Sequence, residues 1–411
     1  MESVDDAIEA LARLPTIAHP TVSPDGDEVA FYYDETGRNE IHVLDRTTGE
    51  RRQWSNGDVP RNARWYLEWG ADGDRVYFHR DEDGDEQNDI YVLTRDGTVE
   101  SVVEMDGQVT LTDVGPDGEW LLVGSNRDGQ MNVFRHDLAT DETSKLTDYD
   151  RAVWQAIASP AGDRFAFATN ETDDFDNRDV YVADIDGSNA RNLGVGDVGA
   201  EATPVDWGLT GDRLLIGDNS TDLGRLGVYD LATDAVTWLG DDRFEETPVA
   251  FLPGGDRVIG TRDRDAVTVP VVYDLATGQR REFDLPDGVN SFGRHPGAGE
   301  PVIDGDRVAL VQTTPTRRPE LLAYDLSTDD TETLLAADYG PFDPADFADA
   351  TYFTVDSDGV PETDAAAVEH DSAAELEIGA LLYDCGERPS PLIVNPHGGP
   401  RGRDPKSFDI Y

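Results

Sequence analysis

The sequence contains one cysteine, Cys385, and only two lysines, Lys145 and Lys406, among its 33 basic residues. A single cysteine excludes an intrachain disulfide and any zinc site built on several cysteines. The acidic N-terminal stretch MESVDDAIEALARLP lacks the basic start and apolar core of a signal peptide, and no apolar run is long enough to span a bilayer. These absences predict a cytoplasmic protein that does not enter a membrane.

Basic residues are also too few to balance the acidic ones. The 86 Asp and Glu residues against 33 Lys and Arg give a formal net charge of −53. Nucleic acids and anionic membranes bind clustered Lys and Arg, and no such cluster occurs, so we expect neither as a partner. Strand-like apolar runs recur along the chain, which indicates a folded protein with an acidic surface rather than disorder. Molar salt shortens the Debye length to about 3 Å, so this composition predicts a halophilic protein.

A turn signature recurs along most of the chain. It reads SPDGD at 23–27, GADGD at 70–74, GPDGE at 115–119, SPAGD at 159–163, GLTGD at 208–212, LPGGD at 252–256 and IDGD at 303–306. Its glycines are 44 to 50 residues apart, and each is expected to supply the positive φ of a tight hairpin. They are Gly26, Gly73, Gly118, Gly162, Gly211, Gly255 and Gly305.

Each turn is followed by two apolar strands, a second turn and a fourth short strand, as in EVAFYY, EIHVLD, DRTTGE and RRQWS. Four strands in about 45 residues are typical of a propeller blade, so seven units predict an all-β, seven-bladed β-propeller over residues 19–358. A pair of β-sandwiches or a β-solenoid fits the regular spacing less well. Residues 1–18 are expected to form a short amphipathic helix and a lead-in, with the helix ended by Pro15.

Several features inside the repeats resemble binding sites. Asp81, Asp83 and Asp85 alternate as in a calcium loop, but the bidentate Glu that such a loop requires is missing. An equivalent acidic loop at 170–179 favours solvated loops, so we expect no metal and no cofactor. The histidines and tryptophans of the repeats are expected to pack within or between blades. They are His19, His42, His79, His136, His295, Trp54, Trp65, Trp69, Trp120, Trp154, Trp207 and Trp238.

The repeat ends after the seventh unit. TYFTVDSDG at 351–359 is expected either to complete a blade or to lead out of the propeller, and an acidic, alanine-rich linker covers 359–374. Two apolar segments follow, LEIGALLYD at 376–384 and PLIVNPHGGP at 391–400, and both are predicted to contain strands.

The propeller, the strand pair and PLIVNPHGGPRGRDPKSFD together resemble the prolyl oligopeptidase family of serine peptidases, in particular its acylaminoacyl-peptidase and dipeptidyl-aminopeptidase-like branch. The resemblance implies that residues 375–411 are the truncated start of an α/β-hydrolase domain. It also implies an oxyanion loop at His397, Gly398, Gly399 and Pro400, in which Gly399 offers its backbone N–H to an acyl intermediate and His397 shapes the loop. In such enzymes the propeller restricts access to small peptides.

The nucleophile elbow G-x-S-x-G does not occur in the sequence. In the family the catalytic Ser, Asp and His follow the oxyanion loop, so all three are expected downstream of Tyr411, and His370 is not a candidate base. The chain is therefore predicted to be inactive alone and to need a hydrolase region, missing through a gene fragment or a frameshift or encoded separately as the other half of a split enzyme. It is also predicted to be poorly packed beyond about residue 360, where its strands have no sheet. The alternative is a TolB-like propeller that binds a partner without catalysis. A metal-dependent or sugar-processing propeller enzyme is a third reading, which no residue spacing supports.

Overall fold

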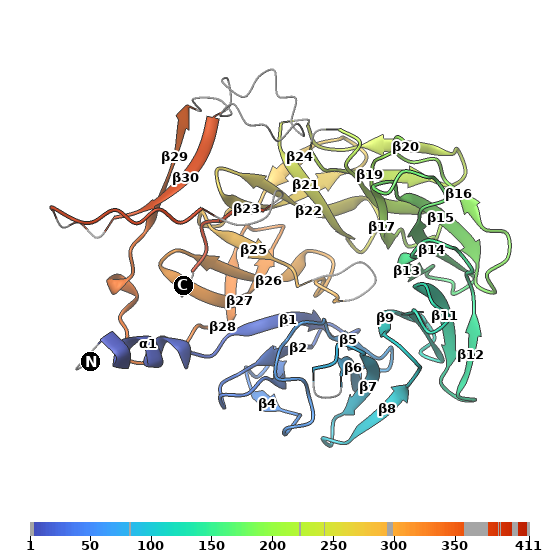
Figure 1. Ribbon diagram of the computed structural model, residues 1–411, viewed down its shortest axis with the longest axis horizontal. Coiled ribbons are helices and arrows are strands. Elements are labelled where there is room, and N and C mark those ends of the chain that lie inside the picture. The colour runs from blue at the N-terminus through green and yellow to red at the C-terminus, as the bar shows by residue number, and fades with distance from the viewer. Residues whose placement is uncertain are drawn as a thin grey trace, which may run out of the picture.

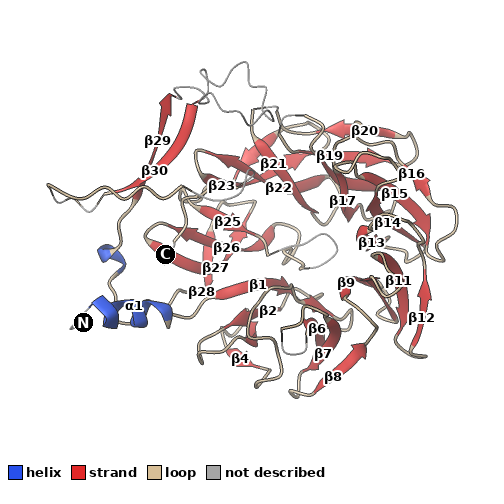
Figure 2. Cartoon of the chain, in the orientation of Figure 1, coloured by secondary structure: helices blue, strands red, loops and turns tan. Residues whose placement is uncertain are grey.

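Short strands make up most of the folded chain (Figure 2). The computed structural model describes residues 4–81, 84–221, 223–241, 243–293, 299–356, 377–384, 386, 388–396 and 402–408. Within these residues, helical structure is limited to α1 (Val4–Ala12) and the 3-10 turn η1 (Pro344–Asp346). The all-β class predicted from the repeats is confirmed.

The described strands form antiparallel four-stranded sheets, each made of four consecutive strands. Five such sheets are separate. They are β1 (Ile17–Val22), β2 (Glu28–Tyr33), β3 (Glu40–Asp45) and β4 (Arg51–Gln53); β5 (Glu68–Trp69), β6 (Arg75–Arg80), β7 (Asp89–Thr94) and β8 (Val99–Val103); β9 (Val109–Val114), β10 (Trp120–Ser125), β11 (Asn132–Asp137) and β12 (Glu142–Lys145); β13 (Trp154–Ala158), β14 (Arg164–Thr169), β15 (Asp179–Asp184) and β16 (Arg191–Asn192); and β17 (Ala202–Trp207), β18 (Arg213–Asp218), β19 (Arg225–Asp230) and β20 (Ala235–Trp238).

The next eight strands form one larger sheet. Its first half is β21 (Glu245–Phe251), β22 (Arg257–Arg264), β23 (Val267–Asp274) and β24 (Arg280–Glu282), and its second half is β25 (Val289–Ser291), β26 (Arg307–Thr314), β27 (Arg317–Asp325) and β28 (Thr331–Leu335). Among the described strands, the backbone pairing between the halves is the parallel pair of Thr268 in β23 and Val289 in β25. Each half is otherwise an antiparallel unit of four consecutive strands, like the five separate sheets.

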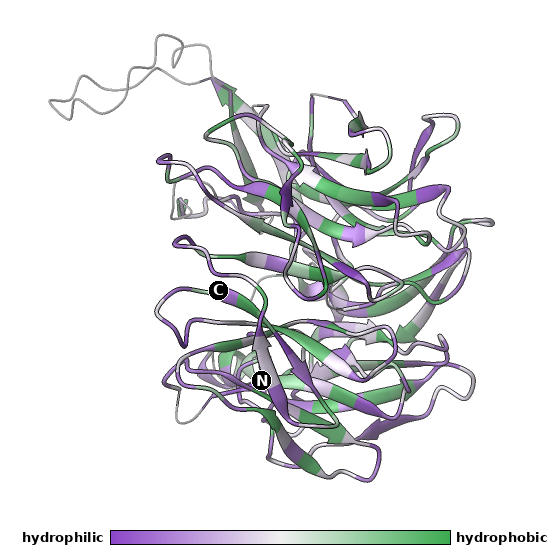
Figure 3. Ribbon diagram, turned by 90° about the vertical axis from the view of Figure 1, so that its right-hand side faces the viewer, coloured by the Kyte–Doolittle hydropathy of each residue, from purple (hydrophilic) through white to green (hydrophobic). Residues whose placement is uncertain are grey.

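The sheets follow one another around a ring (Figure 1). The first strands of neighbouring sheets contact each other, β9 with β13, β13 with β17 and β17 with β21, which places these strands nearest the centre. Buried apolar side chains gather between neighbouring sheets. In Figure 3 the hydrophobic residues are concentrated in the strands. Burial of this apolar surface is the main force that holds the sheets together.

The ring closes by packing between its first and last sheets. Side chains of β1, β2 and β3 share one buried cluster with side chains of β26 and β27. The Val22 N–H donates to the Glu300 carbonyl over 2.7 Å. At Gly26 a Cβ would lie 2.2 Å from the Ile303 carbonyl oxygen, so only glycine fits this contact. Among the described strands, none is exchanged between the first and last sheets.

The repeated turn glycines follow the prediction in six of the seven repeats. Their φ angles lie between 67° and 76° at Gly26, Gly73, Gly118, Gly162, Gly211 and Gly255. Gly305 does not have a positive φ, so the prediction for this turn is wrong. Its turn is one residue shorter, because the Ile303 N–H bonds to the Arg307 carbonyl, whereas in the first repeat the Ser23 N–H bonds to the Glu28 carbonyl.

After β28 the chain leaves the ring. β29 (Ala350–Asp356) pairs antiparallel with β30 (Glu377–Tyr383), and this two-stranded sheet projects from the ring (Figure 1). The described part of the segment 351–359, residues 351–356, therefore leads out of the ring rather than completing a sheet of it, and β30 lies within the segment 376–384 that was predicted to contain a strand. No strand forms at 391–396, where Leu392 and Ile393 are 78% and 88% exposed. The described part of the segment 391–400 therefore does not form the predicted strand, because no described strand lies beside it to pair with its backbone.

The histidines of the ring are packed as predicted. His42, His79 and His136 are buried, and His19 is partly buried. His295 lies outside the described residues. Burial lowers the pKa of His19, of His42 and of His136 below the usual value, because the charged imidazolium loses its hydration.

We expect acid to destabilise the fold through these histidines, and most strongly through His42. Burial, followed by the charge of Arg51, lowers the pKa of His42 to about 4. Because the unfolded value is about 6.5, the stability that His42 contributes is complete above pH 6.5 and is lost as the pH falls towards 4. At about 1.4 kcal/mol per pKa unit, the loss of unfolding free energy between pH 7 and 4.5 is about 2–3 kcal/mol. Urea unfolding at pH 7 and 4.5 in molar KCl measures it.

A His42→Phe variant is the control for this effect. In this variant the free energy of unfolding should depend much less on pH between 6.5 and 4.5, and the remaining dependence should come from His19 and His136. A slope unchanged by this substitution would contradict the assignment.

Candidate functional site

The predicted oxyanion loop, His397, Gly398, Gly399 and Pro400, lies outside the described residues, as do His370 and Cys385. The structure describes the chain on both sides of that loop. Residues 391–396, before the loop, are exposed and have no regular secondary structure. Residues 402–408 after it, which we call the return segment, contact the ring again.

The return segment is held first by the loop between β22 and β23. The Arg403 guanidinium forms an ion pair with Asp263 and donates a hydrogen bond of 2.8 Å to the Thr268 hydroxyl. The Lys406 N–H donates to the Ala266 carbonyl over 2.6 Å. These contacts combine charge, side-chain and backbone partners, so they position the segment as well as attract it.

The end of the return segment is held by the next unit of the ring. The Phe408 N–H donates to the Thr313 hydroxyl over 3.1 Å, next to the loop between β26 and β27. The Phe408 ring packs edge-on against Phe347, with ring centroids 4.8 Å apart, and the Arg318 guanidinium lies 5.9 Å from its centroid. Arg318 is buried and also donates to the Leu14 carbonyl over 3.1 Å, so it links the return segment to the end of the N-terminal helix.

Both contacts lie on one face of the ring. The two loops that hold the return segment each join the second and third strands of a four-strand unit, at 265–266 and 315–316. Because the units repeat one layout, the corresponding loops of the other units lie on the same face, which we call the hairpin face.

A cavity of about 110 Å³ opens on the hairpin face between the unit β9–β12 and the unit β13–β16. Val109, where β9 begins, pairs with Ser125, where β10 ends, so the start of β9 lies at the edge that carries the loop between β10 and β11. The start of β13 lies there for the same reason. The cavity and the return segment are therefore on the same side of the ring.

Aromatic and uncharged polar side chains line this cavity. Trp65 stacks on the buried ring of His79, with centroids 5.1 Å apart, and Trp154 is 42% exposed at the rim. Thr112 Oγ1 and Gln155 Oε1 are buried without a hydrogen-bond partner in the described chain. An unsatisfied buried oxygen is costly and attracts a donor from outside the fold.

The tryptophans divide between two roles. Trp69, Trp120 and Trp207 are buried, and the Trp69 and Trp207 N–H groups donate to carbonyls of the preceding sheet, so the packing prediction is confirmed for them. Trp65 and Trp154 line the cavity, which the sequence alone did not indicate. The signal in the sequence was that Trp154 begins the first strand of its unit, at the edge of the sheet where the cavity opens.

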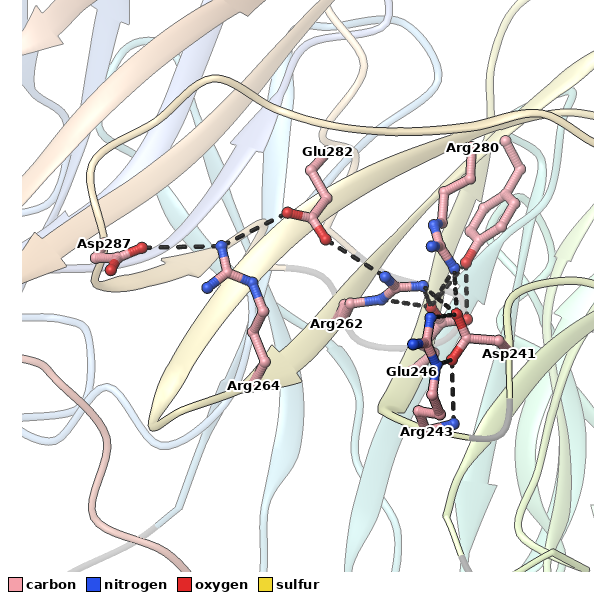
Figure 4. Close-up of polar contacts among 9 residues, drawn as sticks. Asp241, Arg243, Glu246, Arg262, Arg264, Arg280, Glu282 and Asp287 are labelled. Atoms are coloured by element: carbon pink, nitrogen blue, oxygen red, sulfur yellow. Dashed lines mark hydrogen bonds and ion pairs between the residues drawn. The ribbon is translucent and has the colours of Figure 1, made fainter. Parts of the chain in front are cut away.

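A network of ion pairs lies at the junction of β17–β20 and β21–β24 (Figure 4). Arg262 and Glu246 are both buried, and Arg262 Nε donates to Glu246 Oε1 over 2.7 Å. The Tyr273 hydroxyl also donates to Glu246, and burial, strengthened by this carboxylate, raises the pKa of Tyr273. At the edge, hydrogen bonds from Arg243 and then Arg280 hold the pKa of Asp241 well below its usual value. Because the central carboxylate is enclosed by its own partners, we assign the network to stability.

The acidic loop between β6 and β7 uses its carboxylates locally. Asp81 Oδ2 accepts the Glu86 N–H over 3.3 Å, and Asp85 Oδ1 accepts the Gln87 N–H over 2.9 Å. Asp83 lies outside the described residues. No group of three or more His, Cys, Asp or Glu side chains that could hold a metal ion occurs in the part of the chain that the structure describes. That part also contains no helix with the length and apolar character needed to cross a membrane.

Comparison with solved structures relates the ring to the propellers of peptidases. The chain aligns with a prolyl endopeptidase at a TM-score of 0.67 and 16% identity, over 87% of this chain and 55% of that one. It aligns with a puromycin-hydrolyzing peptidase of Mycobacterium tuberculosis at 0.64 and 17%, over 85% and 57%. It aligns with prolyl oligopeptidase B of Galerina marginata at 0.67 and 14%, over 87% and 55%. These similarities establish the shared fold, and this chain spans just over half the length of each peptidase.

Comparison at the level of sequence gives two further matches. Residues 10–179 match the model of the TolB beta propeller domain, PD40. The chain is also 30% identical over 207 residues to the "Uncharacterized protein Atu1656" of Agrobacterium fabrum, an alignment that covers 47% of this chain and 67% of that protein. The chain therefore belongs to the same protein family as the Agrobacterium protein, with a TolB-type propeller and the propeller fold of prolyl oligopeptidase-like peptidases.

Proposed function

We propose that this chain is the propeller and oxyanion-loop portion of an intracellular serine peptidase that cleaves small peptides, of the acylaminoacyl-peptidase or dipeptidyl-peptidase type. The catalytic Ser, Asp and His come from a hydrolase region beyond residue 411, in the same polypeptide or a separately encoded one. The propeller occupies 19–358 after the lead-in 1–18, a linker covers 359–374, and the hydrolase domain starts at 375.

The strand arrangement supports a propeller of seven blades. Five blades correspond to the separate four-stranded sheets, and the halves β21–β24 and β25–β28 of the larger sheet supply two more. The single residue pair between these halves supports their interpretation as two neighbouring blades rather than one continuous sheet.

The observation that carries the peptidase assignment is the seating of the return segment on the hairpin face. Arg403 and Phe408 bring the chain back to this face directly after the predicted oxyanion loop. A hydrolase domain that continued from this point would lie against the hairpin face. Solved peptidases that share the ring are longer than this chain by a length that accommodates such a domain.

In the assembled enzyme the two glycines would serve the chemistry through their backbone. A Ser hydroxyl, deprotonated by a His that an Asp orients, attacks the scissile carbonyl, and negative charge develops on the carbonyl oxygen. The Gly399 N–H would donate to that oxygen with no side chain in the way. The ring would admit only small peptides to the enclosed site.

A TolB-like binding module without catalysis is the alternative, and the match of residues 10–179 to the TolB beta propeller domain favours it. The two functions are separated by co-expressing this chain with the polypeptide encoded immediately downstream. We expect the pair, but not the chain alone, to hydrolyse acyl- or aminoacyl-nitroanilides and to react with a fluorophosphonate probe. An inactive pair would favour the binding module, and labelling of the chain alone would place the nucleophile inside it and overturn the assignment of the catalytic residues to a region beyond residue 411.

The contribution of Gly399 can be measured in the same active pair. Gly399→Pro removes the N–H donor, and the loss of one oxyanion-hole donor lowers kcat by about 10²–10³-fold. Gly399→Ala is the matched control, because it keeps the N–H. Equal losses in both variants would show that the loop tolerates no added side chain at this position, and the effect could then not be assigned to the N–H.

A further inference from the structure

We infer that the cavity on the hairpin face binds one uncharged, apolar side chain of a short peptide. A backbone N–H of the same peptide, from the bound residue or its neighbour, donates to Gln155 Oε1. The inference rests on the proposed function and extends it to the substrate class, since the cavity shares its face of the ring with the return segment. Its evidence is the geometry of Gln155, the size of the cavity and the balance of charge around it.

Gln155 has a positive φ, which is a strained backbone conformation for a residue other than glycine, and His19 in the first unit has the same conformation. Gln155 in β13 and His19 in β1 both lie at an irregularity in the pairing of a first strand, with φ of 47° and 48°. In β1 the strained residue has a partner, because His19 Nε2 lies 2.9 Å from the Ala63 carbonyl oxygen of the next unit. In β13 the strain is retained, yet Gln155 Oε1 is buried with no partner among the described residues. A strained residue whose buried side-chain oxygen has no partner among the described residues is typical of a site that binds a ligand.

The size of the cavity limits what can enter it. Its volume of about 110 Å³ is below the roughly 300 Å³ at which pockets for drug-sized ligands begin. An apolar cavity of about 150 Å³ holds one benzene molecule, so this one suits a single side chain of the size of valine, leucine or proline. The Trp65 ring, Met131 and Val133 supply apolar walls, and Thr112 Oγ1 adds a second unpartnered polar atom.

The charges near the cavity select against an ionised side chain. Among the described residues that line the cavity, none is Asp, Glu, Lys or Arg. Two arginines lie over the tryptophans, Arg64 at 5.9 Å from the Trp65 ring centroid and Arg178 at 5.8 Å from the Trp154 centroid. Both are neutralised by ion pairs, Arg64 with Glu86 at 2.8 Å and Arg178 with Glu201 at 3.3 Å. A charged side chain would lose its hydration and gain no counter-charge.

The test uses the full chain in molar KCl and three blocked tripeptides, acetyl-Ala-X-Ala-amide with leucine, proline or aspartate at X. Tryptophan fluorescence reports binding, because Trp65 and Trp154 line the cavity. We expect saturable binding of the leucine and proline peptides and at least tenfold weaker binding of the aspartate peptide. Gln155→Leu keeps the side-chain shape and removes the acceptor, so it should weaken binding about tenfold.

Gln279→Leu is the matched control, because Gln279 is exposed on an outer turn of another unit, and it should leave binding unchanged. Circular dichroism of both variants establishes that they fold, and Thr112→Val tests the same site if Gln155→Leu does not. Absence of peptide binding, binding unaffected by the cavity variants, or equal binding of the aspartate peptide would overturn the inference. These outcomes need no catalysis, so they are independent of whether the downstream polypeptide restores hydrolysis.

Discussion

Replacing Glu246 with alanine is expected to lower the free energy of unfolding by about 3–5 kcal/mol, because it removes the one buried carboxylate among the described ion-pair partners of the buried Arg262 guanidinium. The Arg262 and Glu246 side chains are 2% and 1% exposed. Glu246 also accepts the Tyr273 hydroxyl at 2.8 and 2.7 Å through its two oxygens. One substitution thus removes the acceptor for two buried donors (Figure 4). Denaturant unfolding in molar KCl measures the loss.

Glu282→Ala is the matched control within the same network. Glu282 lies 3.4 Å from the same arginine, but its side chain is 36% exposed, so water replaces much of the lost interaction. Its removal should cost no more than about 1 kcal/mol. A double variant, Glu246→Leu with Arg262→Leu, should recover part of the stability, because it removes both buried charges together. Equal losses for Glu246→Ala and Glu282→Ala would contradict the assignment.

Lowering KCl from 2 M to 0.1 M is expected to lower Tm by about 10 °C or more, which corresponds to roughly 3–5 kcal/mol at 2–4 °C per kcal/mol. The physical reason is the formal charge of −53 on a compact ring. The Debye length rises from about 3 Å at 1 M to about 10 Å at 0.1 M, so carboxylates on neighbouring loops begin to repel one another. Circular dichroism melts across a KCl series give the dependence.

Sucrose at matched osmolality is the control for the salt series. Sucrose favours compact states without screening charge, so it should not restore the Tm that is lost at low KCl. The loss caused by Glu246→Ala should change little over the same series, because salt screens buried pairs weakly. A Tm that stays constant between 2 M and 0.1 M KCl would show that the acidic surface does not demand salt.

Predictions from local sequence patterns were correct where the structure of a segment depends on residues within that segment. The turn glycines predicted six positive φ angles, and the strand at 376–384 was found as β30. The failures lie where a neighbour decides the outcome. The Gly305 turn is shortened by one residue, and residues 391–396 have no strand beside them. The predicted oxyanion loop at 397–400 lies outside the described residues and stays a prediction.

The class of the fold, the order of its strands and the positions of most turns could be predicted from the residues alone, because glycine conformations and alternating apolar residues act over a few neighbouring residues. The closure of the ring by its first and last sheets, the pairing of Arg262 with its buried carboxylate and the position of the return segment became known with the folded structure. It also decided that Gln155 keeps an unpaired oxygen while His19, in the same strained conformation, bonds to Ala63. Each of these depends on groups that are distant in the chain, or on different units of the ring, and no local pattern records which of them will meet.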